Sequence, residues 1–485
     1  MTDHAAVSNK SRALLFALYL LSVISLTDQE AMSMLGLRKD EAIQRFTKGL
    51  KTALNKVNFL RNYDMVVLQA LVLYMISLQG RSNHDAVWVL SGAVIRIAHK
   101  LGVHRDGETL GLTPFETEIR RRVWWQILIL DSMYATTSGM KPTILPSVSD
   151  TKIPTNVNDA DFSPGSTVIQ PREGPTEMVF LMVVCQVIQF IRDHPIQDIE
   201  HLLLGGQDVE PGTAEYFAYQ ESLNKLRLVA EEFDANLSQI EKDYCDPSGG
   251  PLHVLALSLR PHMLQEARTM ATPYHETPEW GTEVNNSHDN FFRIWLSHNE
   301  NAVSLYEISS HGNFLYAFKS HFHLDSLLFL AGQLVDRSPV GSFAERTWRL
   351  FDRFYNYHDE LWNVTQRLHM QLARLLLKAW DARETALLQI DAPIDTPICV
   401  PRLKMAISQA GLLSLNQRSL SSQFSNGGNQ GSQFGQMQIP GDILPEISQT
   451  SQVPGDWSML DDCQVMDGQN PVLPLFGFFN TSGSW

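Results

Sequence analysis

Apolar residues recur every three or four positions through most of the first 400 residues, and this is the period of amphipathic helices. In residues 84–101 the apolar positions are Val87, Leu90, Val94, Ile97 and Leu101. Ser82, three residues before Asp85, is the expected N-cap. Gly102, directly after the last apolar position, is the expected C-terminal stop. The pattern predicts one amphipathic helix between these two signals.

A second helix is predicted after a short link at residues 104–107. Thr113, Pro114 and Glu116 supply an N-cap, a proline at the first helical position and the third member of a capping box. The apolar positions that follow are Phe115, Ile119, Val123, Ile127, Leu130 and Tyr134. The two helices and their link predict a helical hairpin within a buried bundle.

The polar flank of the second helix carries pairs of opposite charge. Glu116 and Arg120 lie four residues apart, as do Glu118 and Arg122, and such pairs form ion pairs on a helix surface. Arg121 is expected to lie over the Trp125 ring in a cation–π contact.

Further segments have the helical period, and Pro-, Gly-, Asn- and Ser-rich breaks at 140–176, 205–213, 246–251 and 271–289 separate several of them. Residues 63–78 are apolar on nearly every side, which predicts a central helix. Residues 41–60 are predicted to turn an apolar face inward that ends at Leu60, and residues 365–388 a face that begins at Leu368. The other predicted helices are 174–195, 215–240, 252–270, 291–310, 314–335 and 343–362.

The first apolar run, residues 13–26, has the length of a signal-peptide core and follows Lys10 and Arg12. No small-residue cleavage site follows it, and Thr27 to Glu30 form a capping box instead. It is also too short to span a bilayer. A buried first helix is therefore expected, with secretion as the alternative.

Charge and cysteine content restrict the function. The 485-residue chain is 44% hydrophobic, with a net charge of −15 and a pI of about 5.5. Proteins that grip phosphates usually carry a basic excess, so direct DNA contact is not expected from the chain as a whole. The cysteines, far apart and without C-x-x-C, indicate reduced thiols rather than a zinc module of the usual spacing: Cys185, Cys245, Cys399 and Cys463.

Three clusters invite a chemical interpretation, and each has a structural alternative. An iron site of two histidines and a carboxylate is suggested by His323 and Asp325, with His321 and a distal His311 or His358, but residues two apart on a helix point in nearly opposite directions. The segment 104–106 suggests an effector-binding corner or an acid–base pair, whereas hydrogen bonds that fix the hairpin link are the preferred interpretation. The segment 120–122 suggests a nucleic-acid contact, but the preferred interpretation is a helix flank whose arginines form salt bridges. Catalytic and dinucleotide motifs do not occur, which is modest evidence against an enzyme.

Four stretches together resemble the middle homology region of fungal zinc-cluster transcription factors: IRIAHKLGVHRDG, PFETEIRRRVWW, LDSMYATTSGMKP and DTKIPTNVND. The resemblance implies an all-α, multi-helix regulatory domain over residues 11–400, with its core motif at 82–162, and no catalytic residues. The motif residues, regulatory or structural, are Arg96, Gly102, His104, Arg105, Asp106, Glu118, Arg120, Arg121, Arg122, Trp124, Trp125, Asp131, Gly139, Pro142, Pro154, Asn156, Asn158 and Asp159.

The sequence departs from the family pattern in two places. Lys141 stands where the family often has an arginine before the proline. Family members usually begin with a binuclear zinc cluster of six cysteines, which this sequence does not contain. No residue here is therefore assigned to DNA binding, and zinc is expected only if a cluster lies upstream of Met1. DNA would be reached through a partner or through a module missing from the gene model.

The composition changes after residue 418. Residues 419–485, the C-terminal tail, contain no Lys or Arg and six carboxylates, interleaved with aromatic and aliphatic residues. Such a mixture is typical of a disordered activation segment whose apolar residues are taken up by a partner groove. A plain disordered terminus is the alternative. The candidate recruiting residues are Trp457, Met459, Leu460, Asp461 and Asp462.

These expectations combine into a nuclear regulator of transcription, which the resemblance associates with metabolite-biosynthesis gene clusters. Its partners would be the transcription machinery, co-regulators or a related factor in a homo- or heterodimer, without a membrane. An all-helical enzyme or small-molecule-binding protein of such a cluster remains an alternative. A further alternative is a regulator without DNA binding that dimerises with full-length relatives. Activation and repression are both left open.

Overall fold

The computed structural model describes residues 8–78, 84–137, 142–144, 146–194, 209–277, 280, 282–318 and 324–411. All regular elements in these ranges are helices, so the predicted all-α, multi-helix fold is confirmed. The predicted N-cap Ser82, the motif residue Gly139, the proposed iron ligands His321 and His323, and the C-terminal tail lie outside the described residues.

Up to residue 178, the described part of the chain forms six α-helices and a long irregular segment. The helices are α1 (Asn9–Ser25), α2 (Asp28–Leu35), α3 (Lys39–Val57), α4 (Met65–Leu78), α5 (His84–Lys100) and α6 (Pro114–Thr137). The described part of the irregular segment, from residue 142 to α7, is called the exit segment below; it contains the short 3-10 turns Pro146–Val148 and Asp159–Asp161.

The second part of the chain, from α7 onward, contains helices of 4 to 31 residues. They are α7 (Val179–Asp193), α8 (Ala214–Tyr244), α9 (Pro251–Ala271), α10 (Ser287–Ser310), α11 (Leu315–Phe318), α12 (Leu324–Asp336), α13 (Ser342–Tyr357) and α14 (Arg367–Gln389), with residues 399–411 also helical. The predicted helix at 174–195 begins only at Val179, and the one at 314–335 corresponds to α11 and α12.

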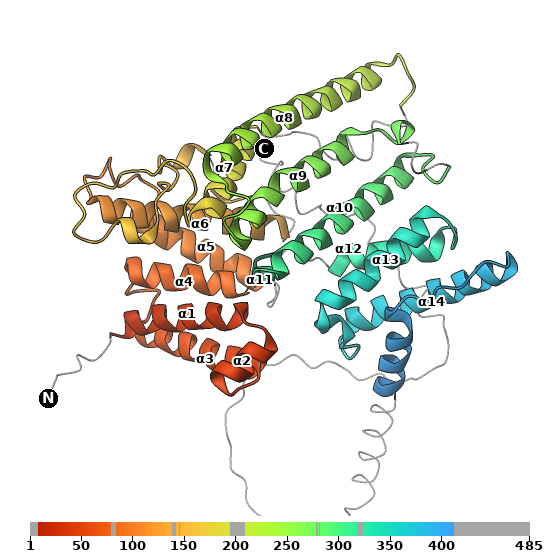
Figure 1. Cartoon of the computed structure of the whole chain (residues 1–485), viewed down its shortest axis with the longest axis horizontal. Helices are drawn as coiled ribbons and strands as arrows, with labels where there is room; N and C mark the ends of the chain where they lie inside the picture. The colour runs from red at the N-terminus through yellow and green to blue at the C-terminus, as the bar shows by residue number, and fades with distance from the viewer. Residues whose placement is uncertain are drawn as a thin grey trace, which may run out of the picture.

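Helices pack mainly against their close neighbours in the sequence. Figure 1 shows α1 and α3 beside α4, then α5 and α6, then α7 to α10, and finally α12 to α14. The short helix α11 packs against its neighbour α10 and also contacts α1, which is distant in the sequence.

Two hydrophobic cores meet at α7. The first core, from Ala13 to Ile188, is built by α1, α3, α4, α5 and α6, with Cys185 and Ile188 of α7. The second core, from Val179 to Leu403, receives Val183 and Phe190 from the other face of α7. Since α7 supplies apolar residues to both, it couples the two halves.

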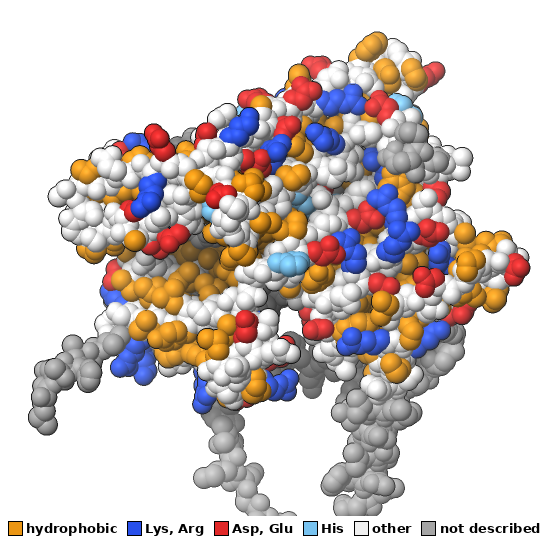
Figure 2. All heavy atoms as spheres, viewed as in Figure 1, with side chains coloured by type: hydrophobic (Ala, Val, Ile, Leu, Met, Phe, Trp, Pro, Cys, Tyr) orange, Lys and Arg blue, Asp and Glu red, His pale blue; other side chains and the backbone are white. Residues whose placement is uncertain are grey.

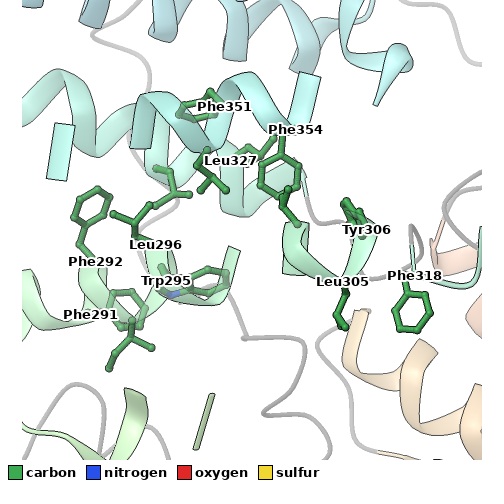
Figure 3. Close-up of a cluster of buried hydrophobic side chains, with 14 of the residues drawn as sticks. Phe291, Phe292, Trp295, Leu296, Leu305, Tyr306, Phe318, Leu327, Phe351 and Phe354 are labelled. Atoms are coloured by element: carbon green, nitrogen blue, oxygen red, sulfur yellow. The ribbon is translucent and has the colours of Figure 1, made fainter. Parts of the chain in front are cut away.

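The second core is rich in aromatic side chains. Figure 3 shows Phe291, Phe292 and Trp295 of α10 facing Leu327 of α12 and Phe351 of α13. Phe292 also lies edge-on to Phe343, with ring centroids 4.9 Å apart. Such pairs add directional preference to the burial of large apolar surfaces.

Several local predictions are confirmed and two face assignments are wrong. The capping box at Thr27 forms, and α4 is buried along most of its length. Leu60 is 65% exposed, because α3 ends at Val57 and Asn58 adopts a left-handed φ of 55°. Leu368 is 44% exposed although Leu372 and Leu376 of the same helix are fully buried.

The first apolar run forms α1, and its Ala13, Ala17 and Leu20 belong to the first core. Among the described helices, none combines the length and apolar character that crossing a bilayer requires.

Candidate functional site: the arginine and tryptophan core of helix α6

The link between α5 and α6 is fixed at both ends by local signals. Gly102 follows α5 with a φ of +70°, the left-handed conformation expected of a C-terminal glycine. At the start of α6, the backbone N–H of Glu116 donates to Thr113 Oγ1 at 3.3 Å. The Glu116 carboxylate accepts from the Thr113 N–H and hydroxyl in return, so the predicted capping box is confirmed.

Arg121 reaches back from α6 to the link. Its Nε and Nη2 donate to the two carboxylate oxygens of Asp106, each at 2.8 Å, and Nη2 also donates to Glu108 at 2.8 Å. Asp106 is 1% exposed and Arg121 7% exposed, which makes this a buried bidentate pair. The expected cation–π contact of Arg121 with Trp125 is therefore wrong: the acidic side chains of the link hold the guanidinium.

The Asp106 carboxylate also joins the link to the exit segment. It accepts backbone N–H bonds from Glu108 at 3.1 Å and from Lys152 at 3.0 Å. Burial disfavours the charged form, but the hydrogen bonds from Arg121, Lys152 and Glu108 outweigh it and lower the pKa of Asp106 to about 2. Asp106 is therefore ionised at neutral pH.

Arg122 holds a second part of the exit segment. It donates to Glu118 at 2.9 Å, as the spacing predicts, and to Asp159 at 2.6 Å. Its guanidinium also lies over the Phe162 ring, 4.9 Å from the centroid. Glu118 in turn accepts the backbone N–H of Thr155 at 3.0 Å. This buried carboxylate thereby connects α6 to the segment that follows it.

Arg120 does not pair with Glu116, and this prediction is wrong. Its Nη1 donates to the carbonyl of Leu101 at 3.0 Å, which caps the C-terminal end of α5. Glu116 is engaged in the capping box with Thr113. Because the Glu116 carboxylate is bonded to Thr113 in the capping box, it does not pair with Arg120.

The two tryptophans have different surroundings. Trp125 donates from Nε1 to the carbonyl of Lys152 at 2.8 Å. Trp124 is fully buried and packs against the rings of His99 and His104, with centroids 5.6 and 6.1 Å away. Both rings belong to the first core, and Trp125 in addition helps to hold the exit segment.

The preferred interpretation of segment 104–106, hydrogen bonds that fix the link, is confirmed. Arg105 donates to Asp150 at 3.0 Å, and the Asp106 N–H donates to the same carboxylate at 2.8 Å. The His104 carbonyl accepts from the Ser149 hydroxyl at 3.0 Å. Burial lowers the pKa of the His104 imidazole, which favours its neutral form.

The asparagines of the exit segment close it on itself. Asn156 donates from Nδ2 to the carbonyls of Arg172 and Gly174, each at 2.9 Å, and accepts from the Thr176 hydroxyl. Asn158 accepts the backbone N–H of Glu177 at 2.9 Å. Pro154 is buried and directly precedes Thr155 and Asn156 in the sequence.

Asp131 is the last motif carboxylate on α6 to hold the exit segment. It accepts the backbone N–H of Ile144 at 2.8 Å, and its burial raises the pKa of the carboxyl above the usual value. Pro142 is half-buried nearby in the sequence, whereas Arg96 is exposed and takes no part in this network.

The structure therefore brings most of the motif residues into one network, which has partners that the sequence did not single out. The clearest are Glu108, Asp150, Lys152, Thr155 and Glu177. Three of them, Asp150, Lys152 and Thr155, lie within the DTKIPTNVND stretch, so the family motif already pointed to this region. Which atoms they bond is determined by the tertiary structure.

This network of Asp106, Glu118, Arg120, Arg121 and Arg122 with the link and the exit segment is called the clamp below, because it holds three segments of the chain together. Its carboxylates are occupied by guanidinium and backbone N–H donors, and within the described ranges no group of three or more His, Cys, Asp or Glu side chains is placed to hold a metal ion.

Residues 2–188 match the family described as "Fungal specific transcription factor domain". These residues therefore form a fungal-specific transcription factor domain. The matched residues end within α7, where the first hydrophobic core also ends at Ile188. The family domain thus coincides with the first core, and the clamp lies inside it.

Curated relatives extend the similarity beyond this domain. The chain is 38% identical over 421 residues to the pyriculol/pyriculariol biosynthesis cluster transcription factor 1 of Pyricularia oryzae, covering 86% of the chain and 55% of that protein. It is 31% identical over 396 residues to the aurofusarin cluster transcription factor aurR2 of Gibberella zeae, covering 79% and 56%. It is 26% identical over 415 residues to the transcriptional regulator AacuB of Aspergillus aculeatus, covering 82% and 53%. The chain spans about half the length of these relatives.

Proposed function

We propose that this chain is a transcriptional regulator, acting in the nucleus, that controls a secondary-metabolite biosynthesis gene cluster. Two of the relatives above are named as transcription factors of biosynthesis clusters, and the similarity covers most of this chain. In this proposal the helical region 11–400 is the regulatory domain, and residues 419–485 recruit the transcription machinery or a co-regulator.

The clamp is the observation that supports a regulatory role for the family domain. Arg120, Arg121 and Arg122 donate to a helix end, to the link and to the exit segment. Arginines held in this way stabilise one arrangement of helices and are not available to neutralise DNA phosphates. The domain then serves to position surfaces for proteins or effectors, which fits control of transcription better than turnover of a substrate.

Expression of the chain in its source fungus tests the proposal. We expect overexpression or deletion to change the transcripts of one contiguous biosynthetic cluster together, and no coordinated change in any cluster would contradict the proposal. The variant Arg121→Ala should weaken the effect by destabilising the clamp, whereas Arg105→Ala, at an exposed pair, should leave it nearly intact.

The tail is tested separately by fusing residues 419–485 to a heterologous DNA-binding module. A recruiting tail should switch on a reporter, and Trp457→Ala with Leu460→Ala should reduce the signal more than Ser448→Ala with Ser451→Ala. A silent fusion would favour an enzyme or small-molecule-binding protein of the cluster. A silent fusion combined with capture of full-length relatives would favour a regulator that acts by dimerisation.

A further inference from the structure

A groove lies between α3, α4 and α5 on the family domain. Its volume is about 650 Å³, which is within the usual range for sites that take small ligands or a few side chains. Apolar side chains form much of it: Ile43, Tyr74, Leu78, Val87 and Leu90. Polar side chains from α3 and α4 complete it: Gln44, Thr47, Lys48, Lys51, Thr52, Asn55 and Ser77.

The charge of this groove has one sign. Lys48 and Lys51 are the charged residues among those that line it, and neither has an ion-pair partner within the described part of the chain. From Ile43 to Val57, α3 carries four basic residues and no acidic one, and α4 carries no charged residue. Figure 2 shows Lys and Arg side chains along the lower edge of the molecule, where Figure 1 places α3.

This basic, apolar groove stands out in a chain with a net charge of −15. An occupant that complements it needs carboxylates beside one or two bulky apolar side chains. The C-terminal tail has this composition at Asp456, Trp457, Leu460, Asp461 and Asp462, and residues 419–485 contain no Lys or Arg that Lys48 and Lys51 would repel.

We propose that residues 456–462 of the tail dock in the groove between α3, α4 and α5 of the same chain. Trp457 and Leu460 pack on the apolar wall, and the carboxylates of this segment pair with Lys48 and Lys51. Such a contact would withhold the tail from other proteins until a partner competes for it.

Covalent attachment makes a weak contact sufficient. Residues 412–455 connect the described helix to the docking segment, and at about 3.3–3.6 Å per residue an extended chain of this length spans on the order of 150 Å. Linkage to the same chain corresponds to an effective concentration on the order of millimolar. Modest ion pairs and two buried side chains then maintain a substantial docked fraction.

The functional consequence rests on the proposed recruiting role of the tail, but the docking itself does not. A tail that docks yet fails to activate a reporter would remove the role and leave the docking intact. A tail that activates but never contacts the groove would do the opposite.

The contact is tested on the full chain by zero-length carbodiimide cross-linking, which joins a lysine amine to a carboxylate with loss of water. At low salt we expect mass spectrometry to find Lys48 or Lys51 joined to Asp456, Asp461 or Asp462. The ion pairs Lys10–Asp64, at 2.8 Å, and Lys152–Glu108, at 2.6 Å, are internal positive controls. Absence of the tail cross-links while both controls react would overturn the proposal.

An equal mixture of isotopically light and heavy chains identifies the occupant. Docking within one chain gives cross-links only between peptides of the same isotope. Cross-links of mixed isotope would show that the tail of a second copy occupies the groove, and the proposal would be wrong.

Chemical labelling of Trp457 provides a readout that does not depend on the lysines as reactants. Lys48→Glu with Lys51→Glu should lower the docking equilibrium by about two- to thirtyfold and expose Trp457, because two exposed ion pairs are replaced by repulsion. Lys225→Glu with Lys378→Glu, on exposed positions of α8 and α14, is the matched control and should leave Trp457 protected. Adding Asp461→Lys and Asp462→Lys to the groove variant should restore protection. Equal labelling of Trp457 in all of these proteins would contradict the proposal.

Discussion

Arg121 in α6 and Asp106 in the α5–α6 link, 15 residues apart, form a bidentate ion pair with both N–O distances at 2.8 Å. Backbone N–H groups from the link and from the exit segment complete the shell of the carboxylate. One buried side chain thus joins three segments of the family domain.

Arg121→Ala should therefore destabilise the domain strongly. It leaves Asp106 buried without its cation, and removal of one partner of a buried pair costs about 3 kcal/mol or more. Denaturant unfolding, followed by a signal from the first core, measures the change. The control is Arg105→Ala, whose pair with Asp150 is exposed and should cost less than about 1 kcal/mol. Equal effects of the two variants would show that the buried pair contributes no more than the exposed one.

The same pair predicts a dependence of stability on pH. The pKa of Asp106 is lowered from 3.8 to about 2 in the folded protein, so its stabilisation is complete above about pH 4 and is lost as the pH falls towards 2. Asp106→Asn should be less stable than the wild type at pH 7, and the gap between the two should close over this range. A gap that stays constant down to pH 2 would argue against this assignment.

Gly107 should not tolerate a side chain, although its backbone is not in the left-handed region. A Cβ at this position would lie 2.3 Å from Thr117 Oγ1 and 2.8 Å from Thr117 Cα, so a backbone atom would have to move. We expect Gly107→Ala to lower the free energy of unfolding by about 1–3 kcal/mol, the usual range for overpacking. Gly92→Ala in α5, where the nearest atom is 4.0 Å away, should instead stabilise by up to about 1 kcal/mol.

The isolated chain should show no salt-sensitive affinity for promoter fragments. Its net charge is −15, and the arginines of segment 120–122 donate hydrogen bonds within the domain. Phosphate contacts would make affinity fall by orders of magnitude between about 50 and 200 mM salt. Fluorescence anisotropy of labelled promoter DNA at these two concentrations measures it. Tight binding that weakens with salt would mean that another basic surface, such as α3, contacts DNA.

Helix positions and caps were predictable because their signals are local. The apolar period of α5 and α6, the glycine after α5 and the capping box of α6 each depend on residues within four positions of one another. One of the failures also has a local origin. Leu60 continued the period of α3, but Asn58 had already ended the helix.

Among the contacts of the clamp, the sequence determined only the one made within a helical turn, Glu118 with Arg122. The partners of Arg120, Arg121 and Trp125 are a helix end, a link and an exit segment, which meet only when α5 and α6 pack together. The groove beside Lys48 likewise combines three helices. The apolar period and the capping residues, which are close together along the chain, determine where each helix begins and ends. The rotation of one helix against the helix it packs on determines which side chains come into contact. That rotation is set by tertiary burial, and so only the folded structure determined these contacts.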